Sequence, residues 1–426
     1  MYEHAHWFQE ERVLFPYSST VPAVTPMRVV SGHGSYLELE DGKRLLDGIS
    51  SWWSVCHGYS HPYIVSKMQE QLAKLSHVMF CRDLIHEGAY VLASRIAKLM
   101  PPGLDRVFFA DSGSMAVEVA MKLAVQYWYS MGKREKHSFI YFKNSYHGDS
   151  MGCISISDPE AIHGESFTRY CPKQYLLDIP ASEEDVVLLQ QKIESIADKV
   201  AAIIVEPLLQ AAGGMVIYHP HVLATLRKIA KENEILFIAD EVATGFYRLG
   251  TAFACEQASV QPDIMVLGKA LSGGTCPLSA AVVSSNISEL FISGGETFMH
   301  GNTFMAHPLS CAAANASLDL FAGESYTQKV LRIERILKAE LEELHALDYV
   351  CNVRIKGAMA AFNIKNKCME KLKNGMTRKI LDLGIWIRPI KTVMYVMPPL
   401  TIAEDELLAL LSALKILVYD CNKIST

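Results

Sequence analysis

The stretch RVFFADSGSMAVEVAMKLAVQYWYSMG (106–132) decides the fold class of this chain. It opens with an apolar run at 106–111, continues through three small residues at 112–114, and ends in residues 115–132, whose apolar positions recur at helical spacing. The apolar run has no polar alternation, which is typical of sheets that helices cover on both faces. The stretch therefore predicts a strand, a tight turn and a helix of an α/β domain.

The same alternation of apolar strands and helices continues along the chain. Strand candidates lie at 139–145, 200–207, 235–242, 264–270 and 278–284, with helix-like segments at 183–199 and 220–233 between them. Strands that are separated by helices predict a mainly parallel sheet. Before this region, helical spacing occurs at 62–76 and 86–100.

The two ends of the chain have a different pattern, which indicates a second, smaller α+β domain. YLELEDGKRLLD (36–47) predicts two strands around an Asp41-Gly42 turn. After about residue 320 we expect a long helix at 325–347, strand-like segments at 353–364, 385–389 and 393–399, a helix at 369–383, and a last helix with a capping box at Thr401-Ile402-Ala403-Glu404.

The predicted organisation follows from this change of pattern. An N-terminal segment (1–54) packs on a small C-terminal domain (321–426), and a large domain (55–320) lies between them in the sequence.

The composition limits the functions that the chain could have. Its 426 residues include 40 Lys and Arg against 46 Asp and Glu, a net charge of −6, and 50% are hydrophobic. This excludes wholesale disorder and gives no basic stripe for nucleic acid. The N-terminus lacks a basic segment followed by an apolar run, and the apolar stretches fall short of the roughly 20 residues that span a bilayer. The ten cysteines include no CxxC pair, so we expect reduced thiols and no metal site in a cytoplasmic protein without membrane partners.

The turn Asp111-Ser112-Gly113-Ser114 is a candidate phosphate site. Small residues let the backbone approach a ligand closely, and the start of the following helix offers unpaired N–H groups and the positive end of the helix dipole. The alternative is that Gly and Ser only form a tight turn here. Spacing alone leaves both interpretations open.

A pair of acidic residues follows the apolar strand in ILFIADEVATGFYRLG (235–250). Asp240 and Glu241 lie at the C-terminal end of the strand, where α/β sheets bind their ligands. A buried carboxylate needs a partner, since an unpaired one is very costly. Asp240 could instead cap the next turn or pair with Arg248, and spacing does not separate these alternatives.

Lys269 follows another apolar run, within LGKALSGG (267–274). It could be a surface lysine whose stem lies along apolar neighbours. A desolvated lysine, however, loses its proton more easily and can form a Schiff base. The strand that ends in Asp240 comes 29 positions earlier, and the two residues match what a pyridine aldehyde cofactor needs: an amine for its carbonyl and an acid opposite its ring nitrogen.

Several motifs in this order resemble the class III aminotransferases, which use pyridoxal 5′-phosphate. The resemblance rests on Asp240-Glu241-Val242-x-x-Gly245-x-x-Arg248, on LGKALSGG, and on GYSHP (58–62), ADSGSMAVEVAMK (110–122), NSYHGDS (144–150) and IIVEPLLQAAGGM (203–215). It implies the fold-type-I architecture, in which a large domain with a mainly parallel seven-stranded sheet is joined to a smaller α+β domain. It also implies a homodimer with shared active sites.

The resemblance implies roles for the residues around the cofactor ring. Lys269 would form the Schiff base with the cofactor and then move the proton between Cα of the substrate and C4′ of the cofactor. Asp240 would keep the ring nitrogen protonated, and Tyr146 would stack on the ring. Glu206 would lie near the cofactor in a role as much structural as chemical.

The resemblance also assigns the phosphate of the cofactor. Gly113 and Ser114 would bind it through N–H and hydroxyl groups. Thr303, in HGNTF (300–304), would add a contact to the phosphate in the other subunit of the dimer.

Further segments, among them DGISSWWSVCHGYSHP (47–62) and FMHGNTFMAHPLSCAAANASL (298–318), resemble members of the family that act in biotin biosynthesis. They imply transfer of the amino group of S-adenosylmethionine to 8-amino-7-oxononanoate, which gives 7,8-diaminononanoate. Arg388 would pair with the substrate carboxylate through two parallel hydrogen bonds. The other expected substrate contacts are Tyr17, Trp52, Asp149, Gly301 and Tyr395, whereas Trp53 is expected in the core.

The chain departs from the family pattern beside these sites, at Asn302, Tyr247, Leu249 and Ala306-His307. These changes could alter the pocket for the amino donor without disturbing the cofactor. Two enzyme alternatives therefore stay open: the same reaction with lysine as donor, or another ω-amino acid aminotransferase that acts on ornithine or 4-aminobutyrate. A third alternative, a binding protein without turnover, has no need of the Lys269 and Asp240 pair.

Overall fold

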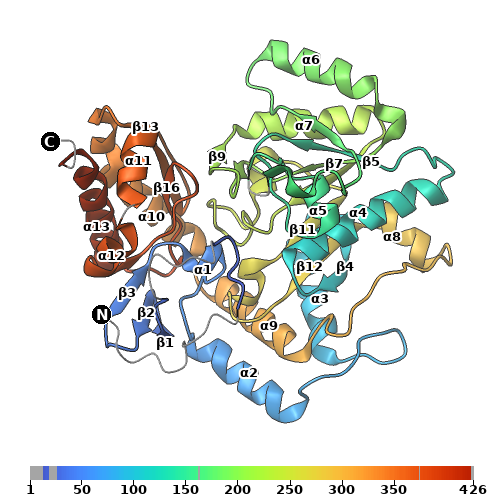
Figure 1. Cartoon of the computed structure of the whole chain (residues 1–426). Coiled ribbons are helices and arrows are strands. Elements are labelled where there is room, and N and C mark those ends of the chain that lie inside the picture. The colour runs from blue at the N-terminus through green and yellow to red at the C-terminus, as the bar shows by residue number, and fades with distance from the viewer. Residues whose placement is uncertain (1–12, 19–25, 162–163, 374, 424–426) are drawn as a thin grey trace.

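A seven-stranded sheet forms the centre of the chain in the computed structural model, which describes residues 13–18, 26–161, 164–373 and 375–423 (Figure 1). Its strand order is β4 (Leu104–Ala110), β12 (Ser279–Ser284), β11 (Ile264–Leu267), β10 (Leu236–Asp240), β7 (Val200–Val205), β5 (Ser138–Phe142) and β6 (Tyr175–Leu177). Strand β12 runs antiparallel to both of its neighbours, and the other pairs, β11–β10–β7–β5–β6, are parallel. The predicted α/β fold with a mainly parallel seven-stranded sheet is confirmed.

Helices cover both faces of this sheet, because its strands are apolar on both sides. Along β10, Phe237 and Ala239 pack into the core of one face, and Leu236 and Ile238 into the core of the other. The helices α4 (Gly113–Ser130) and α8 (Ser285–Ile292) lie on the second face. The first face is covered by α3 (Glu87–Leu99), α6 (Glu183–Glu194) and α7 (Pro220–Glu232). Helix α2 (Pro62–Lys74) packs on α9 (Pro308–Gly323), which leads to the C-terminal part.

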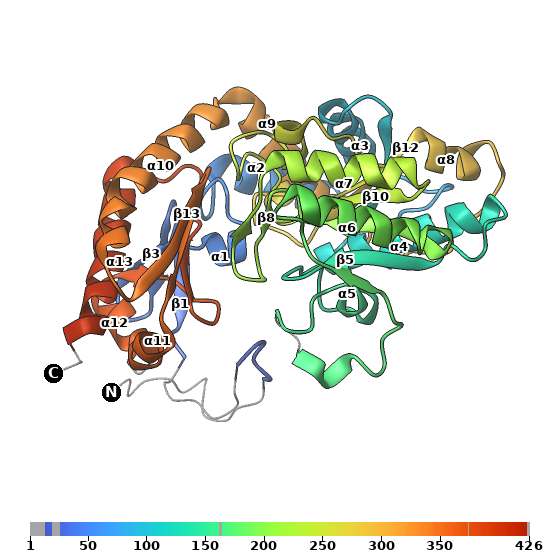
Figure 2. The ribbon, with the colours of Figure 1, turned by 90° about the horizontal axis from the view of Figure 1, so that it is seen from above.

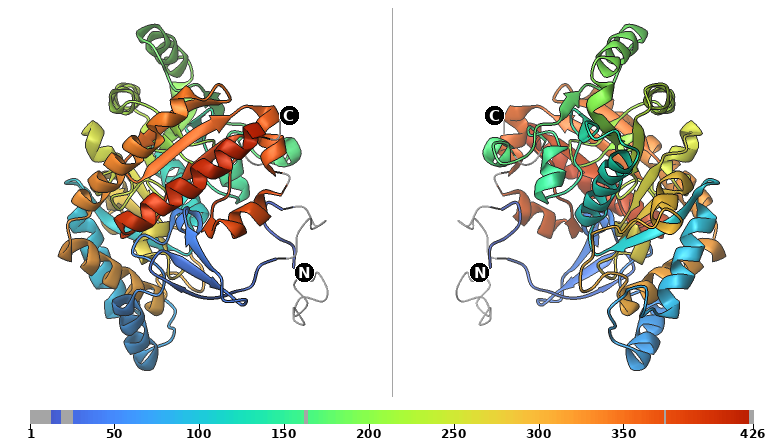
Figure 3. Two further views of the ribbon diagram at one scale, coloured as in Figure 1. Left: turned by 90° about the vertical axis from the view of Figure 1, so that its left-hand side faces the viewer. Right: turned by 90° about the vertical axis from the view of Figure 1, so that its right-hand side faces the viewer.

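The N-terminal strands join the C-terminal part of the chain. Strands β2 (Tyr36–Leu39) and β3 (Arg44–Asp47) form the predicted hairpin, with β1 (Val29–His33) on its outer side. Strand β3 also pairs in parallel with β15 (Ile385–Trp386), so the blue N-terminal strands lie beside the orange and red C-terminal elements (Figure 3). The domain boundaries at 54/55 and 320/321 stay predictions, and residues 1–12, 19–25 and 424–426 lie outside the described residues.

The C-terminal part is a three-stranded antiparallel sheet with helices against it, and it stands to one side of the large domain (Figure 2). Its strands are β13 (Val350–Lys356), β14 (Met359–Ile364) and β16 (Val393–Val396), and its helices are α10 (Tyr326–Leu341), α11 (Asn366–Lys373), α12 (Met376–Asp382) and α13 (Glu404–Lys423).

Three details of this part differ from the sequence predictions. The strand-like segment 353–364 is a hairpin that turns at Gly357, whose φ is +57°. The helix predicted at 369–383 is interrupted at Gly375, which adopts φ +86°, a conformation that glycine reaches without a Cβ clash. The predicted capping box at Thr401 is wrong, because α13 begins only at Glu404 and the Ala403 N–H donates to Glu406 Oε2 (3.0 Å).

The nine cysteines whose side chains the structure describes, all of the ten except Cys421, are free. Within the same residues, no group of His, Cys, Asp and Glu side chains has the arrangement of a metal site. None of the helices described is both long and apolar enough to cross a membrane.

Candidate active site

The loops that follow β4, β5, β7, β10 and β11 enclose a cavity of about 190 Å³ at the C-terminal edge of the parallel strands. This edge is where open α/β sheets bind their ligands, because the loops of neighbouring strands converge there. The cavity is lined by Trp53, Gly113, Ser114, Tyr146, His147, Gly148, Glu206, Asp240, Val242, Ala243 and Lys269. All the residues of this chain that were predicted to surround the cofactor ring therefore lie together.

Lys269 lies inside this cavity, directly after β11. Its Nζ is 4.9 Å from the ring centroid of Trp53. Burial lowers the pKa of the Lys269 amine, and the carboxylates of Asp240 and Glu206 oppose that shift. A buried amine with a lowered pKa is a better nucleophile toward an aldehyde than an exposed lysine. This environment favours a reactive lysine over the surface alternative.

Asp240 ends β10 and pairs with a histidine that the sequence analysis did not single out. Its Oδ2 lies 2.7 Å from Nδ1 of His147, whose side chain is fully buried. Its Oδ1 accepts from the N–H of Val242 (3.1 Å), so the turn-capping alternative is partly right. The pairing with Arg248 is wrong, because that buried guanidinium donates to the carbonyl of Pro398 (2.6 Å). The available signal for His147 was its place beside Tyr146 in NSYHGDS.

The turn after β4 has the geometry of an anion site. Helix α4 begins at Gly113, and Ser114 Oγ accepts from the N–H of Asp149 (3.1 Å), which leaves the hydroxyl proton available to donate. Two glycines keep this region open. A Cβ on Gly113 would come within 3.1 Å of Val242, and one on Gly148 would lie 2.2 Å from Ser114 Oγ. Free first-turn N–H groups and the helix dipole favour a phosphate here.

A second cavity of about 440 Å³ adjoins the first and shares Trp53, Tyr146 and Lys269 with it. Tyr17 and Tyr146 both donate to the carboxylate of Asp149, at 2.5 Å and 3.0 Å. Burial, followed by the hydrogen bond to Asp149, raises the pKa of Tyr17 to about 12. Burial also raises the pKa of Tyr146, so both phenols stay protonated at neutral pH and hold the carboxylate in place.

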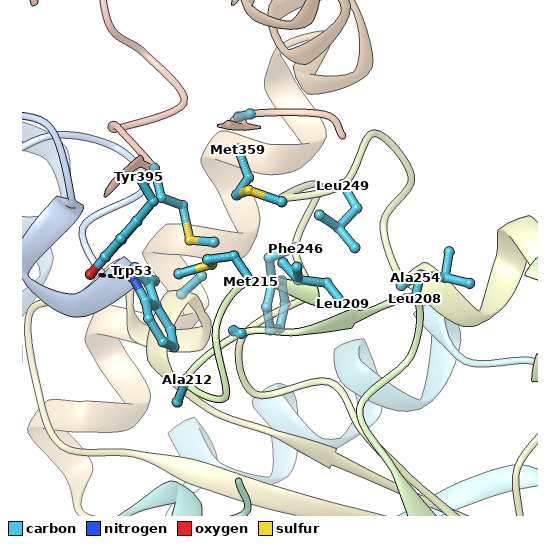
Figure 4. Packing of buried hydrophobic residues seen from close by; sticks show 14 of the residues in the cluster. Trp53, Leu208, Leu209, Ala212, Met215, Phe246, Leu249, Ala254, Met359 and Tyr395 are labelled. Carbon is cyan, nitrogen blue, oxygen red and sulfur yellow. Dashed lines mark hydrogen bonds between the residues drawn. The ribbon is translucent and has the colours of Figure 1, made fainter. Parts of the chain in front are cut away.

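The other wall of the second cavity comes from the C-terminal part of the chain. Arg388 donates to the carbonyl of Tyr17 (3.1 Å), and its guanidinium lies 5.5 Å from the Trp52 ring. Tyr395 lines the same cavity and accepts from Trp53 Nε1 (3.3 Å), as Figure 4 shows. Trp53 is buried, as expected for a core residue, but its ring also lines both cavities. The predicted substrate contacts thus come from three distant parts of the sequence.

Glu206 follows β7 and is fully enclosed beneath the first cavity. Its two carboxylate oxygens accept from the N–H groups of Tyr146 (2.9 Å) and Ala211 (2.8 Å). Burial raises the pKa of Glu206 to about 7. The side chain therefore joins the loops that follow β5 and β7, and its charge state changes near neutral pH.

Two predicted residues are not brought to these cavities. Gly301 and Thr303 are exposed, and neither lines the first or the second cavity of the same chain. A contribution of Thr303 to a second copy of the chain remains a prediction.

Comparison with known proteins agrees with this geometry. The sequence model of the aminotransferase class-III family matches residues 17–418. The adenosylmethionine-8-amino-7-oxononanoate aminotransferases of Buchnera aphidicola (from Schizaphis graminum) and Mycobacterium leprae are 37% and 36% identical to this chain. These alignments cover 96% and 94% of this chain, and 95% and 93% of the relatives.

Two solved structures have the same fold over nearly their whole length. The adenosylmethionine-8-amino-7-oxononanoate aminotransferase of Methanocaldococcus jannaschii has a TM-score of 0.91 and 30% identity, covering 96% of this chain and 97% of that one. A PLP-bound amine transaminase from an uncultivated Pseudomonas species has a TM-score of 0.90 and 29% identity, covering 97% and 99%.

Proposed function

This chain belongs to the class III aminotransferases, which depend on pyridoxal 5′-phosphate, and we propose that it converts 8-amino-7-oxononanoate to 7,8-diaminononanoate in biotin biosynthesis, with S-adenosylmethionine as amino donor. The observation that carries the proposal is the similarity of almost the whole chain to several aminotransferases named for this substrate pair. The second cavity supports it, because an arginine and apolar rings meet there beside the reactive lysine.

The residues of the first cavity fit the cofactor. Gly113 and Ser114 would bind its phosphate, and Asp240, held by His147, would hold the proton on its ring nitrogen. The amine of Lys269 would bind its aldehyde carbon. When bound, pyridoxal phosphate supplies an electron sink for the substrate carbon that loses its proton.

The chain itself handles the proton that amino transfer moves. Burial lowers the pKa of Lys269 Nζ, which favours the unprotonated amine that would take this proton from one carbon and return it to another. Tyr146 and Trp53 line the cavity beside the amine, where their rings would limit access of water. The reaction is a ping-pong exchange, in which donor and acceptor use the same lysine in turn.

The second cavity supports a keto acid as acceptor. The planar guanidinium of Arg388 would bind the carboxylate with two parallel hydrogen bonds. Its contact with the Tyr17 carbonyl uses one N–H of Nη2, out of the five N–H donors that a guanidinium carries. The indole of Trp52 and the ring of Tyr395 would pack along the aliphatic chain.

We further propose a homodimer in which Thr303 of one chain reaches the phosphate site of the other. The exposed position of Thr303, outside both cavities of its own chain, supports this arrangement. A cytoplasmic location belongs to the same proposal.

The test is direct. Purified holoenzyme is incubated with 8-amino-7-oxononanoate and S-adenosylmethionine, and 7,8-diaminononanoate is followed by mass spectrometry. Half-reactions with S-adenosylmethionine, lysine, ornithine and 4-aminobutyrate, followed by the cofactor absorbance, identify the donor. If product forms with lysine and not with S-adenosylmethionine, lysine is the amino donor. If no donor gives product, 8-amino-7-oxononanoate is not the substrate. Unchanged turnover in Lys269→Ala would overturn the enzyme mechanism.

A further inference from the structure

Four consecutive residues beside the active site have a left-handed backbone, although none is glycine. The φ angles of Ser50, Ser51, Trp52 and Trp53 are +50°, +44°, +56° and +74°. L-residues visit this region one at a time, because Cβ then approaches the following carbonyl oxygen. We call residues 50–53 (α1) the left-handed turn. Contacts from outside it must hold this conformation.

The buried carboxylate of Asp47 supplies these contacts. Its Oδ1 accepts from the N–H of Ile49 (2.8 Å), and its Oδ2 accepts from the N–H of Ser51 (2.8 Å). The hydroxyl of Tyr59 also donates to Oδ2. Asp47 has no exposed surface, so these bonds form without competition from water.

The left-handed turn is also fixed to the strand segment that carries Tyr395. Ser50 Oγ donates to the carbonyl of Met397 (2.8 Å), and the N–H of Met397 donates to the carbonyl of Gly48 (2.7 Å). The first residue of the turn and the chain just before it are thereby tied to the C-terminal part.

This conformation directs two neighbouring indoles to the reacting groups. Trp53 lies with its ring 4.9 Å from Lys269 Nζ, and its Nε1 donates to Tyr395. Trp52 faces the second cavity, where its ring contacts Tyr17 edge-on, with the centroids 6.0 Å apart.

We propose that Asp47 is a positioning residue of the active site: its carboxylate holds the left-handed turn, and the turn in turn holds Trp52 and Trp53 against the substrate cavity and Lys269. Asp47 lines neither cavity, so it acts through the backbone. The inference rests on the proposed function only in taking Lys269 as the reactive lysine.

The experiment compares Asp47→Ala, Asp47→Asn and the double variant Asp47→Ala with Ser51→Gly. The alanine removes all three acceptor contacts, and the asparagine keeps one carbonyl oxygen. Glycine at 51 adopts positive φ without a Cβ penalty, so it restores the turn if the backbone is what matters. Asp263→Asn is the matched control. Asp263 also accepts a hydrogen bond from a backbone N–H (Phe237, 2.8 Å), but it precedes β11, whereas Lys269 and the cavities lie at the other end of that strand.

Hydrogen exchange of a peptide covering residues 47–55, measured on the apoprotein, reports the turn without activity. We expect Asp47→Ala to speed this exchange roughly tenfold to a hundredfold, the range for a lost hydrogen bond to a charged group. We expect kcat/KM for 8-amino-7-oxononanoate to fall by a similar factor, mainly through KM, while the cofactor remains on Lys269. Asp47→Asn and the double variant should both recover part of each effect.

Two results would overturn the inference: unchanged exchange at 47–55 in Asp47→Ala, or equal changes in the Asp263→Asn control. If the alanine variant does not fold, Asp47→Asn decides in the same way, with a smaller effect in exchange and in KM. A wild-type enzyme that makes no diaminononanoate defeats the proposed substrate alone, because the exchange and the KM of whichever acceptor is used still test the turn.

Discussion

Nδ1 of His147 lies 2.7 Å from Oδ2 of Asp240, and both side chains are buried at the floor of the first cavity. His147 thus pairs with one oxygen of the Asp240 carboxylate, and the other oxygen, Oδ1, accepts from the N–H of Val242 (3.1 Å). This arrangement holds the Asp240 carboxylate in a fixed orientation, which an acid opposite a pyridine nitrogen requires.

Replacing His147 therefore weakens the hold of Asp240 on the ring nitrogen of the cofactor, although His147 itself would not contact the ring. We expect His147→Asn to lower kcat about tenfold to a hundredfold, because a hydrogen bond to a charged group contributes about 1.5–3 kcal/mol. The single-turnover rate with the amino donor and the dissociation constant of pyridoxal phosphate measure the effect. The exposed His221 gives the control, His221→Asn, which should leave both unchanged. Equal rates for the wild type and His147→Asn would exclude the role.

Gly148 lies against the candidate phosphate site, the turn at 111–114 that we call the phosphate turn, and no larger residue fits there. Its φ is +130°, and a Cβ there would lie 2.2 Å from Ser114 Oγ. We expect Gly148→Ala to displace the Ser114 hydroxyl and to weaken cofactor binding at least tenfold, measured by equilibrium dialysis of pyridoxal phosphate. Gly132→Ala is the matched control, because Gly132 also has positive φ (+76°) but faces open space. Similar cofactor affinities in the two variants would contradict the steric argument.

The sequence predicted the parts of the site that follow from strand and loop order. Asp240 and Lys269 end neighbouring apolar strands, so their approach at one sheet edge follows from the parallel pairing of β10 and β11. The His147 contact could not be predicted, because it depends on how the loop after β5 folds back under β10. The place of Trp53 in the cavity wall could not be predicted either, because an apolar side chain fits a core position as well as a pocket wall.

Two features had no local signal at all. The left-handed turn at 50–53 contains no glycine, so propensity points away from it, and the Asp47 carboxylate that holds it is recognised only from its contacts. The capping box failed for the opposite reason. The Thr401 pattern was locally plausible, but α13 begins only at Glu404, and it is Glu406 that accepts from the N–H just before the helix, that of Ala403.

Glu206 gives the protein a pH-dependent stability. Burial raises its pKa to about 7 in the folded chain, whereas the unfolded value is about 4.5. Between these values the folded chain binds the proton and the unfolded chain has released it, so the free energy of unfolding falls as pH rises. We expect a loss of roughly 3 kcal/mol between pH about 4.5 and 7.

Glu206→Gln removes this part of the pH dependence, because the amide stays neutral throughout. Denaturant unfolding at several pH values measures the difference between the two proteins. Other buried carboxyls with raised pKa, such as Asp47 and Glu241, remain in both and cancel in the comparison. Parallel stability curves for the wild type and Glu206→Gln would contradict the raised pKa.

Thr303 tests whether the active site is shared between two chains. The segment before it is fastened to α4, whose start forms the phosphate turn: Lys122 Nζ donates to the carbonyl of Met299 (2.6 Å), and Gln126 donates to that of Thr297 (3.0 Å). The segment is thus held in place, yet Thr303 remains exposed and away from both cavities of its own chain. If Thr303 binds the phosphate, it does so in a second copy.

Mixed dimers separate the two arrangements. Thr303→Ala and Lys269→Ala each disable a homodimer, the first partly and the second completely. In a mixed dimer, the site built on the Thr303→Ala chain has its own Lys269 and receives Thr303 from the other chain, so it is complete. Random reassociation makes about half of the dimers mixed, each with one complete site, so we expect about a quarter of wild-type activity above the homodimer baseline. If Thr303 served its own chain, mixing would restore nothing, because each site would still lack one of the two residues.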